Sequence, residues 1–238
     1  MLPTIVLVHG AFAESASWDG VVDRLQAAGH TVVAAANPLR GLAADAQSVS
    51  DLVRSIEGPV VLVAHSYGGA VISNVDPDAG DIVGLVYVNG FAPGAGESAF
   101  QLAGMFPGSM LGETTLRPVP RSDGTTDLFI LPDRFHELFC PDVPAPQAAR
   151  MAVSQRPATQ EALVEPSGER SLWSDVPSWF LIGEEDHIIP PALQRYMADR
   201  AGARRTVEIP GASHGAVVSQ PEAIAELILE AACVPAAA

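Results

Sequence analysis

Short apolar runs alternate with helix-like segments along most of this chain. Such an alternation is typical of a parallel sheet that is covered by helices on both faces. The apolar runs that we expect to be strands are residues 4–8, 31–36, the run from 59 to a break at 66, 82–89, 178–182 and 206–209. The expected helices are residues 18–28, 45–56, 191–200 and 221–232. The pattern therefore predicts an α/β fold.

Residues 93–172 interrupt this alternation. The segment is rich in proline and glycine and carries scattered large apolar residues, among them Met105, Phe106, Phe135 and Phe139. Irregular segments of this length are uncommon in compact domains unless they are functional. We therefore expect residues 1–92 and 173–238 to form the core of the fold and residues 93–172 to form an inserted cap over the functional site. A solvated loop is the alternative.

The run that begins at Pro59 breaks at Ser66 and is followed at once by small residues. This is the pattern of a nucleophile elbow, in which a strained turn from strand to helix lifts a serine Oγ above the sheet. Bulky residues two positions before or after the serine would clash, and here these positions hold Ala64 and Gly68. The usual motif has glycine at the first position, so Ala64 departs from it by one methyl group. A serine in an ordinary turn is the alternative.

Two later strands present an acid and a histidine at their carboxyl ends. The strand over 178–182 runs into Gly183-Glu-Glu-Asp186, and the strand over 206–209 leads to His214. The chain order Ser66, Asp186, His214 is the order of nucleophile, acid and base in hydrolases of this fold class. Glu184 and Glu185 precede Asp186, and the spacing from Gly183 to Pro190 favours the aspartate as the acid. His9 and His65 flank turns and are interpreted as structural residues.

Composition is that of a globular domain with a large core. The 238 residues are 48% hydrophobic, which suits one domain of this class. The net charge of −15 argues against a nucleic-acid partner. No apolar run approaches the ~20 residues that span a bilayer, and the first residues lack the basic region of a signal peptide, so we expect no membrane partner and a cytoplasmic location. Cys140 and Cys233 have no metal-type spacing and are interpreted as free thiols.

Four motifs resemble those of the α/β-hydrolase superfamily, in residues 4–12, 61–69, 179–190 and 207–221. The segments 183–190 and 211–221 are most similar to small bacterial esterases related to the plant methylesterase and hydroxynitrile lyase group. The resemblance implies an α/β-hydrolase fold with a mostly parallel sheet and an oxyanion hole. One N–H of that hole is expected from Tyr67, directly after the nucleophile, and the other from Ala11, with Phe12 as the alternative donor.

These residues predict a serine hydrolase that acts on esters or lactones of small, uncharged, hydrophobic molecules, with no metal or other cofactor, as a monomer or homodimer. The candidate substrate-binding residues are aromatic: Phe12, Trp18, Phe91, Phe135 and Phe139. A perhydrolase or haloperoxidase-like activity on the same triad, and a non-catalytic ligand receptor, are alternatives. A hydroxynitrile lyase is disfavoured. The resemblance implies that a lyase of this group has a threonine where this chain has Gly10 and a lysine where it has Gly215, and the chain contains no lysine.

Overall fold

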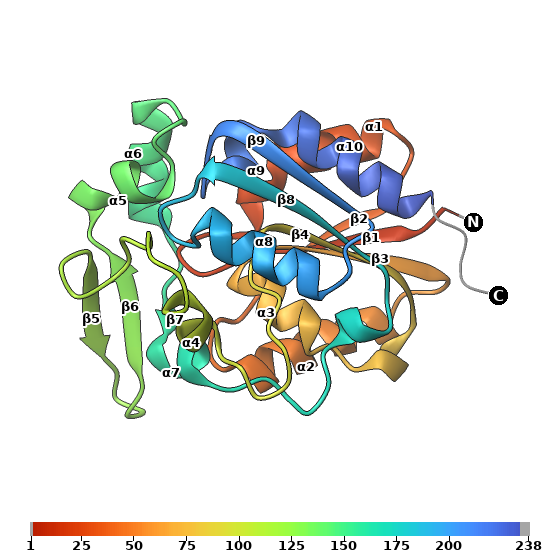
Figure 1. Cartoon of the computed structure of the whole chain (residues 1–238), viewed down its shortest axis with the longest axis horizontal. Helices are drawn as coiled ribbons and strands as arrows, with labels where there is room; N and C mark the ends of the chain where they lie inside the picture. Colours follow the sequence, from red (N-terminus) through yellow and green to blue (C-terminus); the bar gives the residue numbers. More distant parts are fainter. Residues whose placement is uncertain (1, 234–238) are drawn as a thin grey trace.

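The computed structural model describes residues 2–233, which are built on one parallel sheet of six strands (Figure 1). The expected cytoplasmic location rests partly on the first residues of the chain. The first of these, Met1, lies outside the described residues. The strands are β1 Thr4–Val8, β2 Val32–Ala35, β3 Pro59–Ser66, β4 Asp81–Gly90, β8 Ser178–Glu185 and β9 Arg205–Ser213. Their order across the sheet is β2-β1-β3-β4-β8-β9, and every neighbouring pair is parallel.

Helices cover both faces of this sheet, as the alternation predicts. One face packs against α1 (Asp19–Ala27), α9 (Ala216–Ser219) and α10 (Pro221–Ala232), and the other against α2 (Leu42–Arg54), α3 (Tyr67–Ser73) and α8 (Pro191–Arg200). Short 3₁₀ turns lie at Ser15–Trp18, Pro77–Ala79 and Leu172–Ser174. Successive strand residues point to opposite faces, so Ile5 and Leu7 belong to one buried cluster and Val6 and Val8 to the other. The strands are therefore buried on both sides.

Helix α2 begins three residues earlier than the expected Asp45. The N–H of Leu42 donates to the Glu165 carboxylate over 2.5 Å, and Glu165 lies 123 residues further along the chain. The first N–H groups of a helix have no partner within the helix, and a carboxylate there also interacts favourably with the helix dipole. A contact with a residue far away in the sequence therefore stabilises the beginning of α2. The local sequence pattern could not predict this contact.

Residues 93–172, called the cap segment below, contain a second sheet and are not a solvated loop. The sheet is antiparallel with the order β5-β6-β7. The elements are α4 Ala99–Ala103, β5 Leu116–Pro120, β6 Thr126–Ile130, α5 Pro132–Phe139, α6 Ala145–Ser154, β7 Ala158–Thr159 and α7 Gln160–Val164. In Figure 1 most of this segment, drawn in green, lies beyond the arrowhead of β8. It thus lies at the sheet edge where the parallel strands end.

Apolar packing and ion pairs join the cap segment to the rest of the chain. Leu128, Ile130 and Phe135 belong to the same buried cluster as Val6 and the other residues on that face of the sheet. At the surface of this contact Arg40 pairs with Asp127 of β6 over 2.5 Å, and Arg121 pairs with the same carboxylate over 3.0 Å. The buried cluster is continuous across the boundary between the cap segment and the rest of the chain. The division of the chain into a core of the fold and a cap therefore stays a prediction. Within residues 2–233 no helix is both long and apolar enough to cross a membrane.

Candidate active site

Ser66 lies at a strained turn between β3 and α3. Its backbone has φ 55° and ψ −127°, a conformation that a residue with a side chain rarely adopts. The chain packs so closely around this turn that only glycine fits at two positions: a Cβ on Gly68 would lie 2.5 Å from the Val8 carbonyl oxygen, and a Cβ on Gly10 would lie 2.6 Å from the Ser66 Cβ. The ends of β1 and β3 are therefore in contact at this point, and Ser66 is one of the residues that line the larger cavity described below.

Asp186 and His214 meet beyond the ends of β8 and β9. His214 Nδ1 lies 2.9 Å from one Asp186 carboxylate oxygen and 3.1 Å from the other. A carboxylate only accepts, so Nδ1 carries the proton and Nε2 presents its lone pair. Both side chains are buried, and within residues 2–233 His214 Nε2 has no hydrogen-bond partner. The imidazole is therefore held in the form that can accept a proton at Nε2.

The Asp186 carboxylate is fixed by three further donors. The N–H groups of Ile188 and Ile189 donate to Oδ1 over 2.8 and 2.9 Å, and Gln194 Nε2 donates to Oδ2 over 2.9 Å. Glu184 and Glu185 are exposed at the end of β8. Of the three acids in this turn, Asp186 is therefore the one that contacts His214.

Asn89 joins the ends of three strands and was not singled out from the sequence. Its Nδ2 donates to the Ser213 carbonyl oxygen over 2.7 Å, and its Oδ1 accepts from the Gly183 N–H over 2.7 Å. The residue is fully buried and has φ 42°. The signal in the sequence is an Asn-Gly pair at the end of an apolar strand, because asparagine tolerates this left-handed conformation. Asn89 thus ties the segments that carry Asp186 and His214 to β4.

His9 and His65 are buried and uncharged. Burial lowers the pKa of His9 to about 4 and lowers the pKa of His65 well below its usual value. His9 Nδ1 donates to the Gly10 carbonyl oxygen while its Nε2 accepts from the Asn37 N–H, and His65 Nε2 donates to the His214 carbonyl oxygen. The ring of His65 lies 4.7 Å from that of His214. Both residues therefore act as hydrogen-bonding supports of the loops around Ser66 and His214.

The backbone N–H groups of Ala11 and Tyr67 have no hydrogen-bond acceptor among residues 2–233. Tyr67 is the first residue of α3, so its N–H has no partner within the helix. The Ala11 N–H donates to no acceptor within residues 2–233, whereas the Phe12 N–H donates to the Arg156 carbonyl oxygen over 2.9 Å. Of the two candidates for the second donor, the geometry favours Ala11. The Tyr67 hydroxyl is engaged elsewhere, because it donates to Asp45 over 2.9 Å.

A cavity of about 1180 Å³ opens above Ser66 and is mainly apolar. Ala11, Phe12, Tyr67 and Phe91 line it near the strand ends. Most of the remaining lining comes from the cap segment and includes Phe100, Met105, Phe106, Leu111, Leu116, Leu128, Leu163 and Val164. Within residues 2–233 Glu113 is the only charged side chain of the lining. Such a cavity suits an uncharged, hydrophobic ligand.

Three of the expected substrate-binding aromatics do not line this cavity. Trp18 is completely buried among residues of α1 and α10, on the other face of the sheet. The rings of Phe135 and Phe139 are stacked with 4.9 Å between their centres, and the Phe139 ring also meets the His214 ring in an edge-to-face arrangement. Helix α5 turns both rings into the core, and the composition of the segment could not reveal that direction. The structure therefore places Trp18, Phe135 and Phe139 in the core, and only Phe12 and Phe91 of the five expected aromatics at the wall of this cavity.

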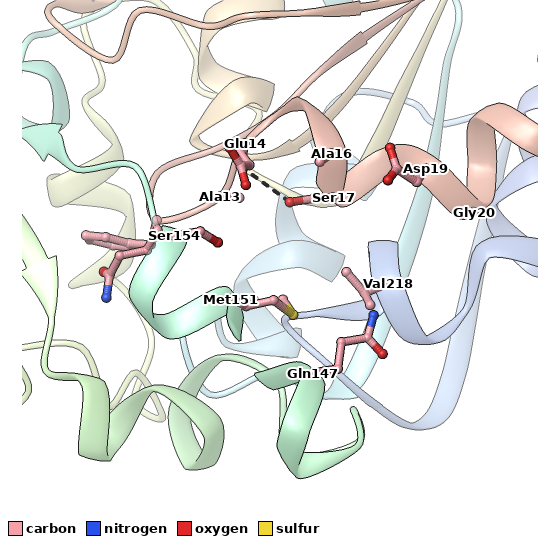
Figure 2. A pocket seen from close by; sticks show the side chains of 12 residues that line it. Ala13, Glu14, Ala16, Ser17, Asp19, Gly20, Gln147, Met151, Ser154 and Val218 are labelled. Atoms are coloured by element: carbon pink, nitrogen blue, oxygen red, sulfur yellow. Dashed lines mark hydrogen bonds between the residues drawn. The ribbon is translucent and has the colours of Figure 1, made fainter. Parts of the chain in front are cut away.

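A second, smaller cavity of about 270 Å³ lies on the other side of Phe12. Figure 2 shows the segment from Ala13 to Gly20 as one wall, with Gln147 and Met151 of α6 pointing toward it from the opposite wall. Phe12 lines both cavities and has φ 61°. Its side chain therefore forms part of the partition between them.

The chain belongs to the alpha/beta hydrolase family, whose model matches residues 5–227. A pyrethroid hydrolase from Sphingobium wenxiniae is 30% identical, covering 98% of this chain and 88% of that protein. The putative methylesterase 19 of Arabidopsis thaliana is 26% identical, covering 95% of this chain and 96% of that protein. A crystal structure of a pyrethroid hydrolase covers all of both chains with a TM-score of 0.79 at 24% identity, which shows the fold. The predicted fold and the predicted relationship to the methylesterases are confirmed.

The two neutral histidines predict a loss of stability in acid. Between pH 6.5 and about 4 the unfolded chain binds a proton at each histidine that the folded protein excludes, so stability falls as the pH decreases through this range. The expected contribution is up to about 1.4 kcal/mol per pH unit for each residue. Urea unfolding at pH 7.5, 6 and 5 should give a shallower decrease for His9→Gln than for the unchanged protein. Equal decreases in the two proteins would contradict the neutral state of His9.

Proposed function

We propose that the protein is a serine hydrolase that cleaves carboxylic esters or lactones of uncharged, hydrophobic molecules through an acyl-enzyme. The observation that carries this proposal is the position of Ser66 at the base of an apolar cavity, beside two free N–H groups, in a fold where His214 is already bound to Asp186. Each of these groups has a role in acyl transfer, and no other described group is needed for the steps below.

The proposed reaction begins when Ser66 Oγ attacks the ester carbonyl carbon while its proton moves to His214 Nε2. Serine is a weak nucleophile at neutral pH, so this transfer is what activates it. The carbonyl oxygen gains negative charge, and the N–H groups of Ala11 and Tyr67 stabilise it. When the intermediate collapses, the bond to the leaving oxygen breaks, and that oxygen takes the proton from His214. Water then attacks the acyl-enzyme, again with His214 as the base, and releases the acid.

Asp186 is proposed to orient His214 and to stabilise its charged form. The carboxylate keeps the Nδ1 proton in place, and the three donors from Ile188, Ile189 and Gln194 keep the carboxylate itself from rotating. This arrangement leaves Nε2 as the acceptor at the moment of attack.

The same geometry argues against lyase chemistry. A threonine in place of Gly10 would bring its Cβ to 2.6 Å from the Ser66 Cβ, and a lysine in place of Gly215 would bring its Cβ to 2.7 Å from the Cys140 Cβ. Real Cβ contacts are longer than this, so neither side chain fits without a shift of the chain. The lining of the cavity supports the proposed substrate class, since an anionic group there would meet Glu113 and no cation.

Replacing Ser66 tests the nucleophile. Ser66→Ala should lower hydrolysis of p-nitrophenyl acetate by about three orders of magnitude or more while the protein stays folded, because the hydroxyl supplies chemistry and little packing. A serine-directed phosphonate should label the unchanged protein at Ser66 and leave the variant unlabelled. A folded variant that keeps a tenth of the original rate would exclude the proposed mechanism.

Replacing the acid tests the role of Asp186. Asp186→Asn should lower kcat by up to about 10⁴-fold, because the amide favours the wrong imidazole tautomer. Glu184→Gln and Glu185→Gln are matched controls from the same turn and should change kcat less than about twofold, since both side chains are exposed. If a glutamine variant is the one that loses activity, the acid is misassigned.

The cavity should set the preferred length of the substrate. Each buried methylene contributes about 0.8 kcal/mol, so kcat/KM for p-nitrophenyl esters should rise severalfold per carbon and level off when the cavity is filled. Phe106→Ala, at the cavity wall, should move that limit to longer chains. Phe129→Ala is the control from the same segment, because Phe129 does not line the cavity and packs against Arg117. A length preference that is flat, or that both variants change equally, would contradict selection by this cavity.

A further inference from the structure

A carboxylate of the cap segment binds the residue next to His214. Asp142 lies in the connection between α5 and α6, and its Oδ2 accepts from the Ser213 N–H over 3.2 Å and from the Ser219 hydroxyl over 2.6 Å. Its Oδ1 accepts from the Ser213 hydroxyl. Within residues 2–233 no arginine pairs with Asp142. The carboxylate is thus engaged by groups of the segment that carries His214, and not by a counter-charge.

The residues before Asp142 contact the same segment from a second side. The Phe139 ring meets the His214 ring edge to face, with 4.9 Å between their centres. Cys140 lies so close to Gly215 that a Cβ there would be 2.7 Å from the Cys140 Cβ. The segment 139–142 therefore contacts the residue before His214, the His214 ring and the residue after it.

Taken together, these contacts hold the loop after β9 between two fixed groups. Asp186 binds His214 at Nδ1 from the β8 side. Asp142 binds Ser213 from the cap segment, and Ser213 in turn accepts from the Gly215 N–H over 3.0 Å. The position of Nε2 relative to Ser66 then depends on where the cap segment holds the backbone on each side of His214.

We infer that Asp142 is a positioning residue for His214, so that the cap segment helps to place the catalytic base as well as to line the cavity. This inference rests on the proposed function, since it assigns His214 the role of base. A displacement of about 1 Å can reduce catalysis on the order of 10²-fold even when the altered residue is remote from the chemistry. Loss of the Asp142 contacts should therefore reduce turnover without changing the apolar wall that binds substrate.

The test compares three variants of the full-length protein, with p-nitrophenyl butyrate as substrate. Asp142→Ala removes both hydrogen bonds from Ser213 to the carboxylate and should lower kcat by about 10- to 100-fold at a KM that changes less than twofold. Asp142→Asn keeps an oxygen that can accept from the Ser213 hydroxyl and should recover part of that loss. Ser219→Ala removes a hydrogen bond to the same carboxylate but leaves Ser213 bound, and should keep kcat within about twofold of the unchanged protein.

Urea unfolding of each variant separates positioning from stability. A fall in kcat for Asp142→Ala, in protein that is fully folded under the assay conditions, with partial recovery in Asp142→Asn and none of the effect in Ser219→Ala, would support the inference. An unchanged kcat in Asp142→Ala, or an equal fall in Ser219→Ala, would overturn it. If Asp142→Ala does not fold, the ratio of kcat between Asp142→Asn and Ser219→Ala decides, and equal values overturn it. Failure of the proposed function would appear separately, as activity that persists in Ser66→Ala.

Discussion

The close approach of β1 and β3 at Ser66 is the constraint on which the site depends. A left-handed backbone at a residue with a side chain costs on the order of 1–3 kcal/mol, and it persists only where the surrounding structure determines it. Here the Val8 carbonyl occupies the space that a side chain at Gly68 would need, and Gly10 leaves room for the Ser66 Cβ. Ala11 follows the end of β1, and Tyr67 follows the end of β3. The packing of these two strand ends therefore places Ser66 beside the segment that contains Ala11.

The electrostatics of the site follow from burial. His9 and His65 lie around Ser66 and His214 and stay neutral because burial disfavours their charged forms. The carboxylate of Asp186 is buried too, but it is compensated by three donors as well as by His214. Among these buried groups, His214 alone has one ring nitrogen bound to a carboxylate and the other ring nitrogen without a hydrogen-bond partner. His214 Nε2 is therefore the candidate proton acceptor, and the other two imidazoles serve as hydrogen-bonding supports.

The cap segment is connected to the rest of the protein at the places that matter for the site. It supplies most of the cavity wall, and Asp142 contacts the loop that carries His214. It also reaches the sheet through Asp127, which pairs with Arg40, and through Glu165, which binds the first turn of α2. Helix α2 carries Asp45, the partner of the Tyr67 hydroxyl directly after Ser66. The segment that contains the second sheet is therefore linked by hydrogen bonds and ion pairs to the elements that carry both Ser66 and His214.

The sequence by itself determined the six strands of the parallel sheet, four of the helices that cover it and the order of the three candidate catalytic residues. Buried parallel strands are continuous apolar runs, and α8 and α10 begin at Pro191 and Pro221, so local patterns suffice for them. Only the tertiary structure decided that α2 begins at Leu42, that Phe12 gives its N–H to Arg156, and that Phe135 and Phe139 point into the core while Phe106 lines the cavity. Each of these outcomes depends on a contact between residues far apart in the chain. The direction in which an apolar side chain points in an irregular segment is set by the surface that it meets, and local periodicity carries no information about that surface.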